Sequence, residues 1–205
     1  MKSIINFLVY ITLIALLSCG KDKSAPTFTK DSFPLKVGNW WEYSVKDLYS
    51  QSPDILTLTI ISMKNMGDIK VFTCTIFEFG TIVDTGYFTL SDTALLYQGY
   101  KPDYSYFGNF QIKIPFKQGD KWQGTYINDS YTTGGYTTDS ISLLTRKYSP
   151  VFTINRSVNQ LPHYSNEQSI SLTPGIGIPA QGFNITNDTI GPQSQDFILI
   201  DYHLN

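Results

Sequence analysis

Few residues of this 205-residue chain have the type and spacing that acid–base or nucleophilic chemistry needs. The two histidines are His163, in an expected loop, and His203, in the last expected strand. The sequence contains no G-x-S-x-G elbow, no H-E-x-x-H pair and no phosphate-binding glycine loop. Glu42 and Glu78 are the glutamates of the early strands, where surface or core-edge positions account for them. We therefore predict no enzyme, no catalytic residue, no bound metal and no cofactor, unless folding brings separated carboxylates together.

Cys74 is the thiol that could react in the body of the chain. It lies in the run VFTCTIF at 71–77, where alternation places it on one face with Phe72 and Ile76 and leaves two threonines on the other. No histidine or basic residue stands beside it in sequence to lower its pKa. We predict a small buried hydrophobe rather than a nucleophile.

The first residues resemble an export signal. Lys2 gives a positive start, and residues 4–17 form an uncharged apolar run. A helix over this run covers roughly 21 Å at about 1.5 Å per residue. The hydrocarbon core of a bilayer is roughly 30 Å thick. The run therefore fits the apolar part of a signal peptide better than a membrane-spanning helix.

The end of this run, LLSCG at 16–20, resembles the lipobox of bacterial lipoproteins, in which an aliphatic and a small residue precede the acylated cysteine. The resemblance implies cleavage before Cys19 and a lipid on its sulfur, which anchors the chain to a membrane. An ordinary secretory signal with a chance cysteine is the alternative. We predict a signal peptide at 1–18, a lipidated flexible tether at 19–33 and one β-rich domain at 34–205.

Location in the envelope follows from the residue after the cysteine. Gly20 stands where an aspartate would mark inner-membrane retention in enterobacterial lipoproteins. We therefore expect an outer-membrane lipoprotein, with the leaflet left open between a periplasmic and a surface-facing position. Lys21-Asp22-Lys23 is a poor match to the acidic surface-export signals of Bacteroidetes lipoproteins.

Composition excludes some partners and favours strands. The formal net charge is −2, and no basic stripe interleaves with aromatic residues, so we expect no nucleic-acid partner. Thr, Ser, Tyr, Phe and Ile are abundant, and these residues favour strands and turns. With Cys19 acylated, Cys74 has no partner for an intramolecular disulfide, so the core alone must hold the fold.

From Trp40 onward the apolar period is two, which predicts short strands separated by turns. So many strands with such short connections imply an antiparallel meander, and a large sheet of this kind curls. We predict an all-β domain in the form of a curved sheet, half-barrel or barrel, with a sandwich as the alternative and a short helix at 160–167 as an option. The expected strands begin at 40 and cover 54–63, 71–77, 81–90, 94–100, 107–116, 121–131, 140–148, 151–158, 167–172 and 196–204, with a turn at Gly134-Gly135.

Two segments share a pattern. PLKVGNWW at 34–41 and PFKQGDKW at 115–122 have Pro, Lys, Gly and Trp at the same offsets. Each pairs a glycine turn with a tryptophan that opens a strand. Either the domain has two similar halves, or the chain uses one turn chemistry twice.

The opening FPLKVGNWWEY at 33–43 and the segment PGIGI at 174–178 are similar to those of uncharacterised Bacteroidetes-type envelope lipoproteins, although Pro179-Ala180 departs from the group's usual continuation. The resemblance implies a curved antiparallel sheet and says nothing of activity. Bacteroidetes also O-glycosylate Asp-Ser/Thr-apolar tripeptides. By that resemblance, Thr93, Ser140 and Thr189 are candidate acceptors, although such tripeptides also arise by chance.

Aromatic residues are the candidate binding groups, since the chain has 14 Tyr, 13 Phe and 3 Trp. They could stack on sugars or line an apolar pocket, although Trp41 and Trp122 also suit core positions. The first hypothesis is a structural or partner-interaction lipoprotein, with a filled interior and an exposed patch. The alternative is a ligand-binding lipoprotein that holds lipid or glycan in an aromatic-lined cavity. The candidate ligand residues are Trp41, Tyr97, Tyr100, Tyr104, Tyr106 and Trp122.

Overall fold

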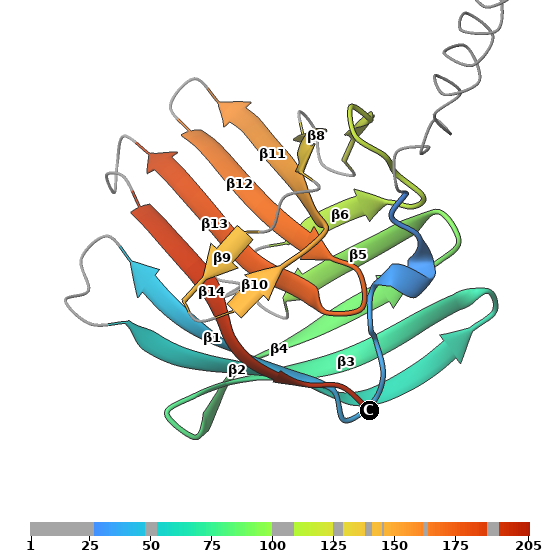
Figure 1. Cartoon of the computed structure of the whole chain (residues 1–205), viewed down its shortest axis with the longest axis vertical. Coiled ribbons are helices and arrows are strands. Elements are labelled where there is room, and N and C mark those ends of the chain that lie inside the picture. The colour runs from blue at the N-terminus through green and yellow to red at the C-terminus, as the bar shows by residue number, and fades with distance from the viewer. Residues whose placement is uncertain are drawn as a thin grey trace, which may run out of the picture.

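The computed structural model describes residues 27–47, 53–99, 109–124, 129–137, 141–144, 146–161, 164–187 and 193–205, and it is all-β, as predicted (Figure 1). One short 3-10 turn, η1, precedes the strands. The described part of the chain holds no helix with the length and apolar character that a membrane crossing needs. The elements are η1 (Lys30–Ser32), β1 (Trp40–Asp47), β2 (Asp54–Met66), β3 (Ile69–Glu78), β4 (Thr81–Leu90), β5 (Ala94–Gly99), β6 (Phe110–Lys113), β7 (Lys121–Gln123), β8 (Asp129–Thr137), β9 (Ile141–Leu143), β10 (Arg146–Tyr148), β11 (Val151–Leu161), β12 (Tyr164–Thr173), β13 (Gly177–Asn187) and β14 (Gln193–His203).

Twelve strands form one antiparallel sheet in the order β6-β5-β4-β3-β2-β1-β14-β13-β12-β11-β8-β7. The first six strands form one meander. β11 to β14 form a second, which β8 and β7 extend. The first and last strands of the chain join the two, because β1 pairs with β14 from Trp40 opposite His203 to Asp47 opposite Gln195. β9 and β10 form a separate small hairpin.

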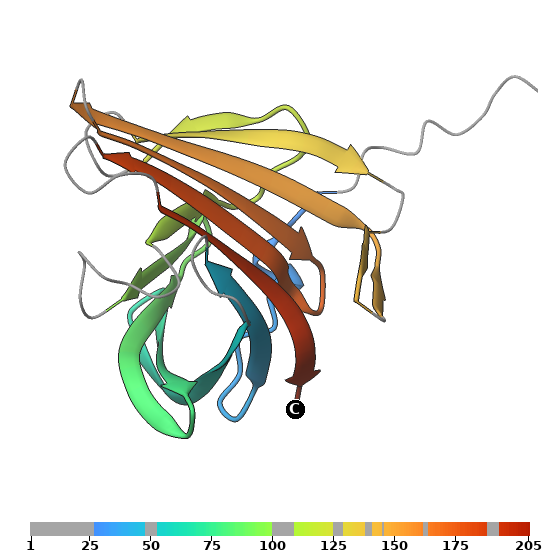
Figure 2. The same ribbon diagram turned by 90° about the vertical axis from the view of Figure 1, so that its left-hand side faces the viewer.

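The sheet curls until its two edges approach each other, which gives a nearly closed barrel (Figure 2). Within the described residues, side chains rather than a backbone ladder bridge the seam between these edges. The Trp122 indole N–H donates to the Gln111 carbonyl at 3.0 Å, and Nη1 of Arg156 donates to the Asn109 carbonyl at 2.7 Å. The seam is therefore held by a few polar contacts and by aromatic packing around Phe116.

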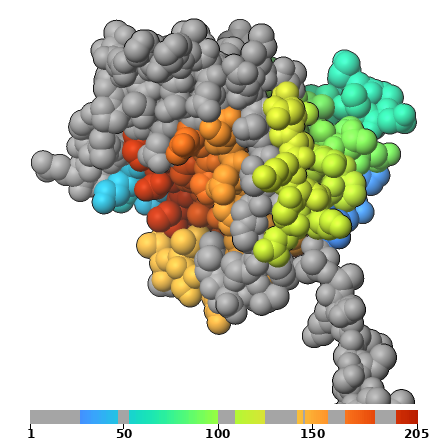
Figure 3. All heavy atoms as spheres, turned by 90° about the horizontal axis from the view of Figure 1, so that it is seen from above, coloured from blue at the N-terminus to red at the C-terminus, as the bar shows by residue number. Residues whose placement is uncertain are grey.

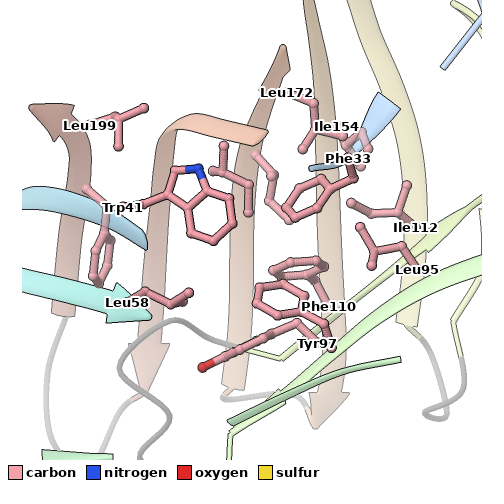
Figure 4. Close-up of a cluster of buried hydrophobic side chains, with 14 of the residues drawn as sticks. Phe33, Trp41, Leu58, Leu95, Tyr97, Phe110, Ile112, Ile154, Leu172 and Leu199 are labelled. Atoms are coloured by element: carbon pink, nitrogen blue, oxygen red, sulfur yellow. The ribbon is translucent and has the colours of Figure 1, made fainter. Parts of the chain in front are cut away.

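The inner face of the curled sheet carries the core (Figure 4). Alternate residues of each long strand point inward, as the period of two predicted. Rings from neighbouring strands and from the segment before β1 meet there. Tyr97 stacks on Phe110 with centroids 5.5 Å apart, and Phe33 lies 6.4 Å from the Trp41 ring. Buried apolar residues on both meanders include Leu58, Ile76, Phe88, Leu95, Ile112, Phe152, Ile154, Ile170, Leu172, Phe197 and Leu199.

The last part of the predicted tether belongs to the core. Phe28 is buried and forms a two-way backbone bridge with Phe116, and Phe33 packs against Phe88 at a centroid separation of 5.7 Å. The boundary at Pro34 was therefore placed too late, and the folded domain includes the described residues from Thr27 onward. The polar neighbours of Phe28 and Phe33 hide these two anchors from a reading based on periodicity.

Three local predictions are corrected. The described residues of the expected helix at 160–167 are in strands, because β11 ends at Leu161 and β12 begins at Tyr164. Gly134-Gly135 lies inside β8, where a register shift opposite Phe152 and Ile154 marks a bulge instead of a turn. β13 was not predicted, because Pro179 and its glycine neighbours give no alternation. Pro179 is tolerated because it stands opposite a register shift in β12, where the ladder is already interrupted.

The two Pro-x-Lys-x-Gly-x-x-Trp segments, here called the first and second turn units, share their backbone geometry. In the first, the Asn39 amide donates to the Lys36 carbonyl, and Gly38 has φ of 91°. In the second, the Asp120 amide donates to the Lys117 carbonyl, and Gly119 has φ of 87°. A positive φ at the third position of a four-residue turn is the type II arrangement, which favours glycine.

Candidate functional site

Several predicted site residues lie outside the described residues. These are Cys19, Tyr100, Tyr104, Tyr106, Ser140, Thr189 and His163, so their predicted roles stay predictions. Thr93 is described. It lies exposed in the turn between β4 and β5, where its amide donates to the Ser91 hydroxyl at 3.3 Å. A modifying enzyme could reach a residue in this position.

Trp41 and Tyr97 are in the packed interior rather than on an exposed surface (Figure 4). The Trp41 indole N–H donates to the Ile176 carbonyl at 2.6 Å, which ties β1 to the turn before β13. The Tyr97 ring lies 4.8 Å from Phe88 and directly over Gly86, where an added Cβ would stand 2.6 Å from the Tyr97 hydroxyl. Both side chains fill space that a ligand would need.

Trp122 is only partly buried and lies at the seam. Its ring packs 6.1 Å from Phe116, and its indole N–H is used by the Gln111 carbonyl. The structure therefore gives Trp122 a closing contact between the two sheet edges. Trp41 packs against Phe33 and Trp122 against Phe116, and no ring contact joins the two tryptophans among the described residues.

The groups considered for catalysis are not brought together. Glu42 pairs with Thr57 and Glu78 pairs with Leu56, and successive residues of β2 point to opposite faces, so the two carboxylates lie on opposite sides of the sheet. His203 is exposed and stacks on Trp40 at 6.3 Å. Among the described residues, no group of three or more His, Cys, Asp or Glu side chains could hold a metal ion.

Cys74 is a core residue, as predicted. Its side chain is fully buried between Ile60 of β2 and Gly86 of β4, its partners in the register. Burial raises the pKa of the thiol to about 12, and the nearby Asp84 carboxylate acts in the same direction. Because the thiolate is the reactive form, this cysteine is inert at neutral pH.

The distal part of the β2–β3 hairpin projects from the barrel (Figures 1 and 3). Every residue from Ile61 to Lys70 is exposed, although the first seven residues of β2 alternate inward in the usual way. We call this segment the projecting hairpin. It holds four large apolar side chains that are 40 % to 58 % exposed: Ile61, Met63, Met66 and Ile69. Met66 stands directly opposite Ile69 on one face of the hairpin, whereas Met63 stands opposite Phe72 on the other face. Exposed apolar side chains in such numbers are typical of an interaction surface rather than of a free solvated turn.

A second unusual feature is a polar pair on the inner face of the second meander. Arg156 of β11 stands directly opposite Gln168 of β12, and both are buried, 8 % and 3 % exposed. They continue the inward phase of Ile154 and Ile170. Among the described residues, neither the amide nitrogen nor the amide oxygen of Gln168 has a hydrogen-bond partner. An unpaired buried polar group costs about 1–3 kcal/mol.

The sequence carries a signal for this pair. In 152–158, alternation places Arg156 with Phe152, Ile154 and Val158, and in 167–172 it places Gln168 with Ile170 and Leu172. A polar residue in the inward phase of a strand marks a buried polar group. The sequence indicates the projecting hairpin less clearly, because the apolar alternation of β2 is interrupted after Ile60, where the pairing with β3 shifts register.

Comparison with known proteins gives likeness at the level of structure only. No protein-family model and no curated protein sequence matches the chain. A crystal structure described as a lipoprotein of Parabacteroides distasonis aligns with a TM-score of 0.47 at 10 % identity, over 86 % of this chain and 100 % of that one. An exported protein of Bacteroides fragilis, described as having a YmcC-like fold, aligns with a TM-score of 0.48 at 12 % identity, over 83 % of this chain and 98 % of that one.

Proposed function

We propose that this chain is a cell-envelope lipoprotein, tethered to the outer membrane through Cys19, that acts as a partner-interaction module. The lipobox at 16–20 and the apolar run before it support the anchor. In a Cys19→Ala variant, incorporation of a labelled fatty acid into the protein is expected to disappear. Retention of the label would overturn the anchor.

The observation that carries the interaction role is the exposure of the projecting hairpin. Its four large apolar side chains keep 40 % to 58 % of their surface in water, and burial against a partner would stabilise a complex by about 25 cal/mol for each Å² removed from water. Met63 and Met66 suit such a contact, because methionine adapts its shape and is enriched at protein interfaces. Lys64 and Lys70 flank them against the single acid Asp68, so the partner surface is expected to be apolar with an acidic rim.

The alternative, a lipid or glycan held in an aromatic-lined cavity, has less support. It requires the rings of Trp41 and Tyr97 to face a ligand, whereas both rings pack against other side chains. A barrel whose inner face is occupied in this way is better suited to presenting its outer surface. We therefore place the function on the projecting hairpin.

Site-specific photo-crosslinking tests this proposal. A photoreactive amino acid at Met66 is expected to give one discrete adduct in the native host, whereas the same group at Ser169, exposed on the outer face of β12, is not. Excess wild-type protein should compete for the adduct, and an Ile69→Asp variant, changed directly opposite Met66 on the same face, should not. Equal adducts from both positions, or equal competition by the variant, would overturn the proposal.

A further inference from the structure

The projecting hairpin has an unpaired backbone edge as well as exposed side chains. The pairing between β1 and β2 stops at Trp40. The first turn unit adds one more contact, in which the Ile60 amide donates to the Asn39 carbonyl at 2.9 Å. β2 continues beyond this point to Met66, and among the described residues no strand pairs with it on the β1 side (Figure 1). We call residues 62–66 on this side the free edge.

The hairpin turn determines which backbone groups point to the free edge. Met66 stands opposite Ile69 across the two-residue loop Gly67-Asp68, and a loop of this length is closed by a hydrogen-bonded pair. Hydrogen-bonded and non-hydrogen-bonded pairs alternate along an antiparallel ladder. Asn65 and Met63 therefore direct their N–H and C=O groups away from β3 and toward the free edge. Such an edge is a template for another strand.

Lys64 lies between these two residues and determines which strand fits. Its side chain is exposed, and a charged side chain on an edge discourages pairing with a like edge. A second copy of this chain, paired antiparallel over all of residues 62–66, would place Lys64 opposite Lys64 with Cβ atoms about 5 Å apart, which is destabilising. A carboxylate in the same place would form an opposite-charge pair. The free edge therefore fits a strand with an acidic residue better than it fits its own copy.

We propose that the free edge binds an extended segment of the partner as an added β-strand, with an acidic residue opposite Lys64 and an apolar residue opposite Met66. Lys64 and Met66 are two positions apart, so both partner residues lie on the face that also carries Ile69. Main-chain hydrogen bonds give such a complex its affinity, and the alternate side chains give its specificity. This inference rests on the proposed interaction role and adds the way in which the partner binds.

Two substitutions of Asn65 separate the backbone contribution from that of the side chain. Asn65→Pro removes an N–H from the free edge and leaves the bonds to β3 in place, whereas Asn65→Ala keeps that N–H. The photo-adduct formed from position 66 in the native host is expected to be lost in the first variant and kept in the second. An adduct that persists in Asn65→Pro would overturn the added strand and leave the interaction role standing. Absence of a discrete adduct in the otherwise unchanged protein would overturn both.

Hydrogen exchange gives a test that does not depend on how well the proline variant folds. In the purified adduct, the amides of Met63 and Asn65 should exchange about tenfold more slowly than in the uncoupled protein, because they gain hydrogen bonds. The Lys64 amide already faces β3 and should change less. Unchanged exchange at Met63 and Asn65, or equal slowing at all three amides, would overturn the added strand.

Reversal of one charge tests the acidic residue of the partner. Lys64→Glu is expected to abolish the adduct, whereas Lys147→Glu, an equal charge change at an exposed position of the β9–β10 hairpin, should leave it intact. Mass spectrometry should find an acidic residue in the linked segment of the partner. An adduct with twice the mass of this chain would identify a second copy instead. That result, or an adduct unaffected by Lys64→Glu, would overturn the acidic strand.

Discussion

The two turn units have the same residues at the same offsets and the same backbone turn, yet they contribute to the fold in different places. In the first unit, Trp41 is buried in the core and Asn39 is bonded to both Pro34 and Asn205. In the second, Trp122 lies half-buried at the seam, and the Asp120 carboxylate accepts a hydrogen bond from the Lys117 amide of its own turn. Local sequence therefore sets the turn, and tertiary surroundings set how much stability it supports.

The tryptophans are expected to give the largest difference between the units. Trp41→Ala removes a buried ring and leaves the Ile176 carbonyl unbonded, at a cost of about 3–5 kcal/mol in the free energy of unfolding. Trp122→Ala removes a partly exposed ring and one hydrogen bond, at a cost of about 1–2 kcal/mol. Urea denaturation measures both. Equal losses would show that the seam is as important to stability as the core.

The residue after the glycine should give the next largest difference. Asn39→Ala leaves the Pro34 carbonyl and the Asn205 amide without their part-buried partner, and we expect a loss of about 2–3 kcal/mol in the free energy of unfolding. Asp120→Ala removes the exposed 3.1 Å hydrogen bond that the carboxylate accepts from the Lys117 amide, and we expect this bond to account for a loss of about 0.5 kcal/mol. Hydrogen exchange at the Asn205 amide should accelerate only in the Asn39 variant. Acceleration in both variants would mean that the units are coupled.

Gly38 and Gly119 distinguish the cost of backbone strain from the cost of a steric clash. Gly38→Ala and Gly119→Ala both place alanine at positive φ, which costs about 1–2 kcal/mol. At Gly38 the new Cβ would also stand 2.5 Å from the Asn205 side-chain nitrogen, whereas at Gly119 it meets nothing within 4 Å. The extra loss at Gly38 should therefore vanish in an Asn205→Ala background, as chemical denaturation can show. A persistent difference would point to the turn itself.

Two exposed ion pairs, one on each meander, should give the smallest effects. Lys30 bonds to Asp92 and Arg146 bonds to Asp201, and in each pair the hydrogen bond lowers the pKa of the carboxyl below its ordinary 3.8. A lowered folded-state pKa gives stability that is fully present above 3.8 and is lost as the pH falls through the folded value. Melting temperatures of Asp92→Asn and Asp201→Asn should therefore approach that of wild type only in strong acid. A difference that vanishes near neutral pH would contradict this assignment.

Alternation in the sequence predicted most strands, including β4 with its bounds, because each strand buries one face. Alternation did not predict β13, because Pro179 and nearby glycines interrupt the apolar–polar pattern there. It also did not predict burial of Phe28 and Phe33, because these core residues stand alone among polar neighbours. The pairing of Arg156 with Gln168 could not be predicted, because register between strands depends on the bulges near 153 and 160. Trp41 and Tyr97 were predicted as ligand-binding residues, but both are buried in the core, because the curvature of the sheet turns their side of the strands inward.

Because the first and last strands pair in the middle of the sheet, the order of synthesis matters to this protein. β1 to β6 can pair in turn as the chain emerges with its N-terminus first, whereas β1 keeps an open edge until β14 is available. An open edge is a template for pairing with other chains. A nascent chain stopped before residue 193 would therefore carry a complete half-sheet with an unprotected border, and late truncation should cause more aggregation than loss of an outer strand such as β6.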